Sequence, residues 1–246
     1  MVTDHVIVDL IMGAMSKAIP DRVMADSCGC LYNFASAINL ETHPRGGEIN
    51  HRQGWGEVVP GGLGARATKD GISVMSCNVT NCALPPIEAQ EIEGPVLFIE
   101  RFILPDSAGP GKFRGGFSQK TKWKTLGYDT QFSYLSQKSK IPPQGLFGGR
   151  PGRCSEWIIN EGTSKEMKLK YAMGDPLFLE YGDSVTFITP GGGGYGNPFE
   201  RDPEAVREEV KKELLSIKRA KKDYGVVIDP ITLQVDEEAT KVARKN

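Results

Sequence analysis

Five polar side chains in the first third of the chain are of the types that line a pocket for a polar small molecule. They are Arg66, Asp70, Asn78, Asn81 and Glu88. A guanidinium can hold an anion through paired hydrogen bonds, and carboxylates and amides can orient a polar substrate. We expect all five to line a pocket and treat them as this chain's candidate catalytic residues. The alternative for each is a structural role in fixing a loop, because such side chains readily bond the nearby backbone.

The first two candidates belong to a glycine-rich stretch, residues 61–71. Their spacing lets Arg66 and Asp70 pair across a turn, either as an ordinary salt bridge or as a clamp on a substrate. The other three candidates follow in a stretch with few charges, residues 77–88, where buried amides usually hold loops in place.

A second glycine-rich stretch, residues 190–196, formally contains the dinucleotide pattern Gly-x-Gly-x-x-Gly at Gly191, Gly193 and Gly196. In a phosphate-binding loop a helix opens directly on the glycines and points its N-terminus at the anion. Here the next helix is expected only at Asp202. The pattern therefore favours a glycine-rich turn that allows close backbone packing over a nucleotide site.

A third stretch, residues 109–116, invites comparison with a phosphate loop but lacks the spacing and the Lys-Ser/Thr ending of a Walker A sequence. Lys112 and Arg114 could hold an anion or a carboxylate. A surface hairpin corner is the alternative that we favour.

The cysteines and histidines do not form a recognisable metal or nucleophile pattern. Five cysteines occur, and their spacings include Cys-x-Cys and Cys-x4-Cys but no zinc-ribbon arrangement. Three scattered histidines are too few for a convincing metal cage. No Gly-x-Ser-x-Gly elbow and no obvious Cys–His pair is present. We expect reduced thiols and predict no metal-binding and no cofactor-binding residues on this chain.

The composition excludes some classes of partner. Among 246 residues, 30 Lys and Arg oppose 31 Asp and Glu, which gives a formal net charge of -1. This balance does not favour binding to nucleic acid or to an anionic membrane. No apolar run approaches the length of a membrane span, and the start does not resemble a secretory signal. We therefore expect a cytoplasmic protein.

The elements expected to position these residues are mostly short strands. Residues 6–19 predict a helix with apolar residues on more than one face, so we expect it to be buried and its start to be covered by something else. From about residue 23 to 190, short apolar runs alternate with turn-rich stretches. The strands expected from these runs are 96–102, 131–135, 155–159 and 184–188.

A helical tail follows the strand region. Asp202 is a good N-cap with Pro203 at the first helical position, and Ser216 can cap a second helix that ends at Gly225. The last residues, from about Ile231, are charged and expected to be peripheral. The fold class predicted is β-dominated α+β: a turn-rich, multi-stranded β body with an N-terminal buried helix and a C-terminal helical tail. We expect the body over residues 1–200 and the tail over residues 201–246.

Several segments taken in order resemble the hydantoinase B/oxoprolinase family. The carriers are Gly61-Gly-Leu-Gly-Ala-Arg66, Asp70-Gly71, Pro86-Ile-Glu88, Glu100-Arg101, Pro105-Asp-Ser107, Gly109-Pro-Gly-Lys-Phe-Arg-Gly-Gly116, Thr189-Pro-Gly-Gly-Gly-Gly-Tyr-Gly-Asn-Pro198, Glu200-Arg-Asp-Pro-Glu-Ala-Val206 and Asp223-Tyr-Gly-Val-Val227. The match covers nearly the whole chain, but a full B-type subunit of this family is about twice as long.

The resemblance implies a subunit of a hetero-oligomeric, ATP-dependent enzyme, inactive alone. In that family a hydantoinase A-type partner binds ATP with Mg²⁺ and phosphorylates the substrate, and the B-type subunit handles the activated species at a divalent metal. The His- and Asp-rich metal segment belongs to the N-terminal half, so the resemblance carries no metal ligand onto this chain. The implied partners are the A-type subunit, a separate N-terminal half of the B-type subunit and a small-molecule substrate.

Three functions stay open at this stage. The first is a split C-terminal subunit of a complex that opens a cyclic amide after carbonyl phosphorylation. The second is a subunit of an ATP-dependent ketone carboxylase of the acetone or acetophenone type. The third is a non-catalytic structural module, which the absent metal segment permits. Departures from the family pattern, such as Ala108 where many relatives have glycine, put specific loop roles in doubt.

Overall fold

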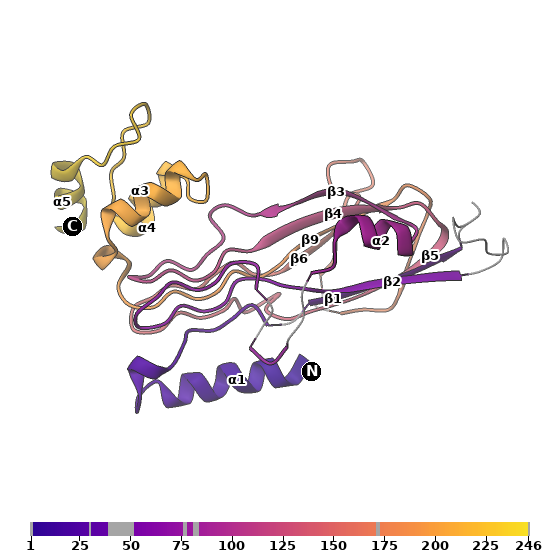
Figure 1. Cartoon of the computed structure of the whole chain (residues 1–246), viewed down its shortest axis with the longest axis horizontal. Helices are drawn as coiled ribbons and strands as arrows, with labels where there is room; N and C mark the ends of the chain where they lie inside the picture. The colour runs from indigo at the N-terminus through magenta and orange to yellow at the C-terminus, as the bar shows by residue number, and fades with distance from the viewer. Residues whose placement is uncertain are drawn as a thin grey trace.

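The computed structural model describes residues 2–29, 31–38, 52–75, 78–80, 84–170 and 173–245. Two β-sheets form one end of an elongated molecule, and a helical tail forms the other (Figure 1). Between them run glycine-rich segments without regular secondary structure. Helix α1 (Val2–Met15) lies along these segments as a separate layer.

The first sheet contains four strands in the order β2-β1-β5-β8, and every neighbouring pair is antiparallel. Its strands are β1 (Leu31–Ile38), β2 (Arg52–Val59), β5 (Tyr128–Ser136) and β8 (Leu177–Leu179). The predicted strand 131–135 lies inside β5. Strands β1 and β2 were not predicted, because their apolar residues are interrupted by Asn33, Glu57 and glycines.

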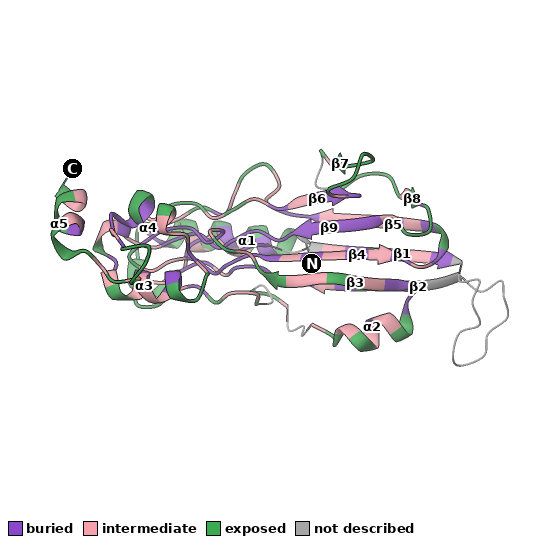
Figure 2. Ribbon diagram, turned by 90° about the horizontal axis from the view of Figure 1, so that it is seen from above, coloured by how far each residue is buried: buried purple, intermediate pink, exposed green. Residues whose placement is uncertain are grey.

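The second sheet contains five antiparallel strands in the order β3-β4-β9-β6-β7. Its strands are β3 (Val96–Ile103), β4 (Gln119–Thr125), β6 (Glu156–Ile159), β7 (Met167–Lys168) and β9 (Ser184–Ile188). Three predicted strands are confirmed as β3, β6 and β9. Central strand β9 is buried along its whole length, as Figure 2 shows.

Aromatic side chains from both sheets fill the space between them. Trp55 of the first sheet meets Trp123 of the second edge-to-face, with ring centroids 5.3 Å apart. Trp123 also contacts Phe132, at 5.6 Å. Strand β4 shows how the sequence encodes this layer, because its residues alternate between buried and half-buried, with Trp123 inward and lysines outward. The core of the sheet half is therefore a side-chain core.

The stretches expected to be turns instead lie side by side as mainly extended segments joined through their backbones. Segment 190–196 is central among them. Its amide groups donate to the carbonyls of Arg153, Gly116, Asp26, Arg150, Phe113 and Leu146 at 2.8–3.1 Å. A Cβ atom on Gly192 would lie 1.9 Å from the Leu63 carbonyl oxygen. The glycines are thus required for close backbone packing, as the sequence indicated, but in a bundle of extended segments and not in isolated turns.

The tail forms three helices around a small core of its own. Helix α3 (Pro203–Lys211) begins at Asp202, whose carboxylate accepts from the Glu204 amide at 3.0 Å. Helix α4 (Ile217–Tyr224) begins at Ser216 and ends at Gly225, which adopts φ +63°. Both predicted helices and their caps are confirmed. A third helix, α5 (Glu237–Lys245), was not predicted.

The expectation that the first helix is buried is wrong for this chain by itself. Helix α1 exists, but it spans Val2–Met15 and not the predicted 6–19. It turns His5 and Asp9 toward the body and exposes most of its large apolar side chains. The short helix α2 (Ile87–Glu93) was not predicted; it packs beside β3 and β2, and its Gln90 accepts from the Trp55 indole N–H at 3.1 Å. None of the helices in the described ranges is long and apolar enough to cross a membrane.

Candidate functional site

Asp70 lies where the glycine-rich segments meet the tail, and it does not pair with Arg66. Its carboxylate accepts two hydrogen bonds from Arg201, at 2.7 and 2.8 Å, and one from the Arg114 amide at 2.9 Å. Burial raises the pKa of Asp70, but the hydrogen bonds and charge of Arg201, helped by Arg114, outweigh it and hold the pKa below its usual value. The expected Arg66–Asp70 pair is corrected to an Asp70–Arg201 pair.

Glu209 completes this group. Its Oε1 accepts from both Arg114 and Arg201, and the side chains of Arg201 and Glu209 are almost fully buried. We call Asp70, Arg114, Arg201 and Glu209 the junction cluster, because it joins the glycine-rich segments to the tail. Arg114 is therefore not at a surface hairpin corner, and its guanidinium is occupied by protein groups.

A cavity of about 350 Å³ opens beside the junction cluster. Its lining consists of Lys69, Asp70, Lys112, Phe113, Glu200, Arg201, Asp202 and Ala205. Lys112 pairs at the surface with Glu200, at 3.4 Å. The acidic and basic side chains here mostly neutralise one another, so the cavity offers no strong preference for an anion or a cation.

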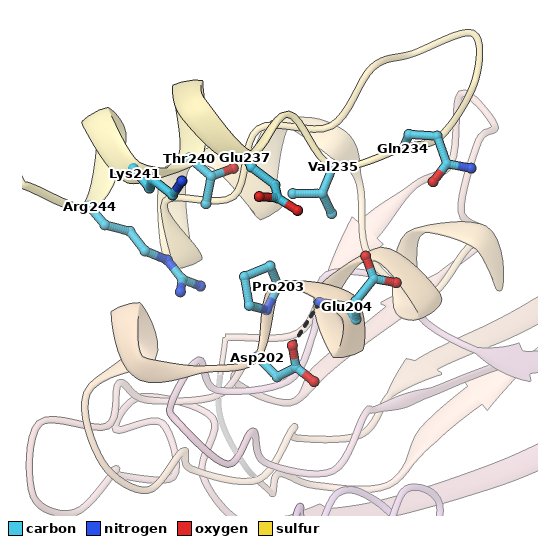
Figure 3. Close-up of a pocket in the computed structure, with 9 residues that line it drawn as sticks. All are labelled: Asp202, Pro203, Glu204, Gln234, Val235, Glu237, Thr240, Lys241 and Arg244. Atoms are coloured by element: carbon cyan, nitrogen blue, oxygen red, sulfur yellow. Dashed lines mark hydrogen bonds between the residues drawn. The ribbon is translucent and has the colours of Figure 1, made fainter.

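A cavity of about 460 Å³ lies within the tail, between α3 and α5, and Figure 3 shows its nine lining residues. Two of its charged groups, Arg244 and Asp202, already have structural partners. Arg244 donates to the carbonyls of Arg201 and Tyr224, and Asp202 caps α3. The cavity therefore fits a structural gap between helices better than a ligand site.

A second charged group lies beneath α1, and sequence reasoning missed it. Lys138, at the end of β5, places its ammonium 2.9 Å from Asp9 and 3.0 Å from Asp26. Asp9 also accepts from the Ser27 amide at 3.2 Å. We call Asp9, Asp26, Ser27 and Lys138 the helix cluster. The available signal was Asp9 itself, a charge within an otherwise apolar helical run.

The helix cluster contains one lysine between two carboxylates. Burial raises the pKa of Asp9 even though Lys138 opposes this effect. Burial lowers the pKa of Lys138, but Asp9 and Asp26 outweigh it and raise that pKa. Lys138 therefore stays protonated, and its charge is largely used to hold α1 against the body.

Of the other predicted site residues, Asn78 contacts this group and Arg66 lies in the glycine-rich segments. Asn78 is exposed and donates to the Ser27 hydroxyl at 3.4 Å, which connects it to the helix cluster. Arg66 forms backbone bridges with Met24 and Lys69, and its Nε is buried with no hydrogen-bond partner among the described residues. Arg66 is thus the candidate with the most unused donor capacity.

The remaining candidates do not join them. Glu88 is exposed in the first turn of α2, beside the sheets. Asn81 lies outside the described residues. The four described candidates therefore lie in four different places. Asn78 adjoins the helix cluster, Asp70 is in the junction cluster, Arg66 is in the glycine-rich segments and Glu88 is on α2.

Metal and nucleotide chemistry have limited support on the described part of the chain. No group of three His, Cys, Asp or Glu residues that could hold a metal ion occurs within it. Cys154 is a free thiol, and burial raises its pKa. The backbone amides of residues 191–196 all donate to backbone carbonyls, so they are not available to cradle a phosphate.

Comparison with known proteins gives a consistent family. The model of the hydantoinase B/oxoprolinase family matches residues 1–198. An uncharacterized protein of Methanocaldococcus jannaschii is 38% identical over 98% of this chain and 40% of its own length. The caprolactamase subunit beta of Pseudomonas jessenii is 30% identical over 96% of this chain and 40% of its own.

Solved structures agree with these matches. The crystal structure of the ATP-dependent caprolactamase from Pseudomonas jessenii has a TM-score of 0.73 at 27% identity and covers 95% of this chain and 40% of that one. A nucleotide-free acetone carboxylase has a TM-score of 0.74 at 20% identity, covers 92% of this chain and 33% of that one, and shows the shared fold alone. The chain spans about 40% of the length of the Methanocaldococcus jannaschii relative and of the caprolactamase subunit beta. On the family match and the shared architecture together, this chain belongs to the hydantoinase B/oxoprolinase family.

Proposed function

We propose that this chain is the C-terminal portion of a B-type subunit in an ATP-dependent complex that opens a cyclic amide. The observation that carries the proposal is its similarity to the caprolactamase subunit beta over 96% of the chain, together with the matching caprolactamase fold. The relatives are named caprolactamases, which indicates the reaction class, and we extend that reaction class to this chain.

Activation by ATP makes chemical sense for such a substrate. An unstrained amide is a poor electrophile, and phosphorylation of its carbonyl oxygen makes the carbonyl carbon easier for water to attack. In the resulting adduct the ring C–N bond breaks, the nitrogen takes up a proton and leaves as the amine, and an acyl phosphate remains. A second water then displaces the phosphate to give the carboxylate, and donors that stabilise the developing negative charge lower the barrier to each attack. We propose that ATP and Mg²⁺ bind on an A-type partner subunit. As the family resemblance implies, we assign any divalent metal to the N-terminal half of the B-type subunit.

The proposed role of this chain is to form a wall of the active site. Arg66 is the strongest of the five pocket candidates, because its buried Nε has no hydrogen-bond partner among the described residues. Asn78 is the second, because it is exposed and adjoins the helix cluster. Asp70, Asn81 and Glu88 remain weaker candidates, and Asp70 is engaged by Arg201.

The proposal includes a division of the chain into a body over residues 1–200 and a tail over residues 201–246. The separate apolar cluster of the tail and the family match that ends at residue 198 support this boundary. The proposed compartment is the cytoplasm, as the sequence suggested.

The test is an activity assay of the assembled complex. We expect ATP hydrolysis coupled to ring opening of a lactam or hydantoin, independent of bicarbonate, and no turnover by this chain alone. Arg66→Lys should lower turnover while leaving the thermal midpoint nearly unchanged, because the substitution keeps the charge but loses the guanidinium geometry. Absence of lactam or hydantoin turnover by an intact complex would contradict the proposal.

Two other functions stay open. A ketone carboxylase subunit is the alternative, because the family resemblance includes carboxylases of the acetone and acetophenone type. Bicarbonate-dependent ATP turnover with a ketone would establish it. A non-catalytic module is the third possibility, supported by the structural use of Asp70 and Arg114. Full activity of the partner subunits without this chain would favour that reading.

A further inference from the structure

Helix α1 is built with its polar side inward. The residues that it buries are His5 and Asp9, which are four apart and so lie on one stripe; Ser16, just past the end of the helix, is also buried. Asp9 on this stripe contacts Lys138 of the body at 2.9 Å. The opposite side carries the large apolar residues Val6, Ile7, Leu10, Ile11 and Met15, each 43–70% exposed. We call these five residues the outer face of α1.

This arrangement is the reverse of the usual amphipathic helix, in which the apolar side faces the core. The only charged residues between Val2 and Met15 are Asp4 and Asp9, and Asp9 is turned inward. The tail helix α4, in contrast, buries Ala220 and Tyr224 and exposes lysines. Asp4 is exposed near the start of the outer face, beside Ile7 and Ile11 on the helix, and the rest of this face is apolar. A mainly apolar exposed helix face of this size marks an interaction surface.

The outer face also leaves room for a close neighbour. No atom lies within 4 Å of the position that a Cβ on Gly13 would take. Glycine is disfavoured inside a helix, and packing within this chain does not require it here. Gly13 and the adjacent exposed Ala14 would let the backbone of a second helix approach closely.

The length of the relatives indicates what occupies this face. The matched region makes up 40% of the Methanocaldococcus jannaschii relative and 40% of the caprolactamase subunit beta. In each relative the rest of the protein is on the same chain, so an interface between it and this region would be permanent. Permanent interfaces are more apolar than transient ones, so a mainly apolar face fits a permanent partner better than an exchanging one.

We infer that the outer face of α1 is the docking surface for the rest of the B-type subunit, which packs an apolar helix against it. This inference rests on the proposed function, because it requires that such a remainder exists as a partner. It deepens that proposal by naming the contact residues, with Leu10 and Ile11 at the centre of the interface.

The experiment uses the full chain and, as probe, the part of the Methanocaldococcus jannaschii relative that lies outside the matched region, produced as a separate tagged polypeptide. We expect the wild-type chain to be captured. Leu10→Glu and Ile11→Glu should each weaken capture about tenfold or more, because a charge is then buried at the centre of an apolar interface. Ile231→Glu, at a position 89% exposed in the tail, is the matched control and should bind like wild type.

The outcomes separate the inference from the proposed function. Equal capture of wild type and Leu10→Glu would overturn the inference and leave the proposed function standing. Failure of the wild-type chain to bind the polypeptide would contradict the proposed assembly and the inference together. Self-association of the chain that Leu10→Glu abolishes in sedimentation would assign the face to a second copy, and would also overturn the inference. Unchanged circular dichroism and thermal midpoint would confirm that the variants fold.

Discussion

The sheet half and the glycine-rich half of this molecule are held together by opposite means. In the sheet half, large side chains such as Trp55, Trp123 and Phe132 fill the space between two sheets. In the glycine-rich half, backbone atoms of neighbouring segments contact one another directly, with few side chains between them. Segment 190–196 satisfies its amides by donating to several different neighbouring segments.

The difference determines what each half tolerates. A side-chain core can relax around a smaller residue, at the cost of a cavity. A backbone bundle cannot relax around an added atom, because each neighbour is fixed by its own hydrogen bonds. The glycine-rich half is therefore the more rigid platform, and both charged clusters are anchored to it through Asp26 and Asp70.

The largest effect expected is from Gly192→Ala. The added Cβ would lie 1.9 Å from the Leu63 carbonyl oxygen, and all of its nearest neighbours are backbone atoms. We expect a loss comparable to the whole stability of a domain, about 5–15 kcal/mol, and so no folded protein. Circular dichroism and expression as a monodisperse species would measure this.

Gly13→Ala is the matched control for that substitution. Nothing lies within 4 Å of its added Cβ, and the residue is inside a helix. We expect the chain alone to gain up to about 1 kcal/mol in free energy of unfolding. Similar effects of the two substitutions would show that the backbone bundle is not closely packed.

Trp123→Ala should have the next largest effect. The side chain is fully buried between the sheets and contacts Trp55 and Phe132. Truncation should lower the free energy of unfolding by about 3–5 kcal/mol without preventing folding. Urea denaturation of Trp123→Ala beside the milder Trp123→Phe would test this. A loss under 1 kcal/mol would contradict the side-chain core.

Glu209→Gln tests the junction between the glycine-rich half and the tail. The substitution keeps the shape of the side chain but removes the charge that Arg114 and Arg201 share. We expect a loss of roughly 1.5–3 kcal/mol, as for a hydrogen bond to a charged group. Hydrogen exchange should show faster opening of α3 and α4 than of the sheets. Uniform exchange across the molecule would argue against a local junction.

The acid dependence of the junction should follow from Asp70. The folded state lowers the pKa of this carboxyl below 3.8, chiefly through Arg201 acting against burial. The stability contributed by Asp70 is therefore present above pH 3.8 and is lost as the pH falls through the folded pKa. The free energies of unfolding of wild type and Asp70→Asn, measured by urea denaturation, should differ near neutral pH and become equal in acid. A difference that grows in acid would show that folding raises the pKa of Asp70 instead of lowering it.

The smallest effect is expected from Glu88→Ala. This side chain is exposed on α2 and belongs to neither charged cluster. The free energy of unfolding should change by less than about 0.5 kcal/mol. Lower turnover of the assembled complex with unchanged stability would support Glu88 as a pocket residue, and unchanged turnover would remove it from the candidates.

Local signals in the sequence were sufficient to predict the regular elements with strong periodicity or caps. Residues 184–188 read as a strand and form β9, and Asp202 with Pro203 marks the start of α3. The strands that were missed contain polar or small residues whose burial depends on distant partners. Glu57 in β2 is buried because Arg101 of β3 meets it at 2.8 Å, and no local pattern reveals that pair.

The candidate site was less predictable, because residues near one another in sequence need not face the same space. Asp70 was expected to pair with Arg66, four residues away, but pairs with Arg201 from the tail. The helix cluster brings together Asp9, Asp26 and Lys138, which only the tertiary structure places within 3.0 Å contacts.

The sequence by itself determined the family, the glycine-rich segments and the caps of the tail helices, because these depend on residue identity and short spacing. The tertiary structure decided what those features do. Glycine permits close approach, but only the assembled neighbours of Gly192 make it required. Helix α1 is apolar in sequence, but only the position of Lys138 decides that its polar stripe faces inward and its apolar side faces out.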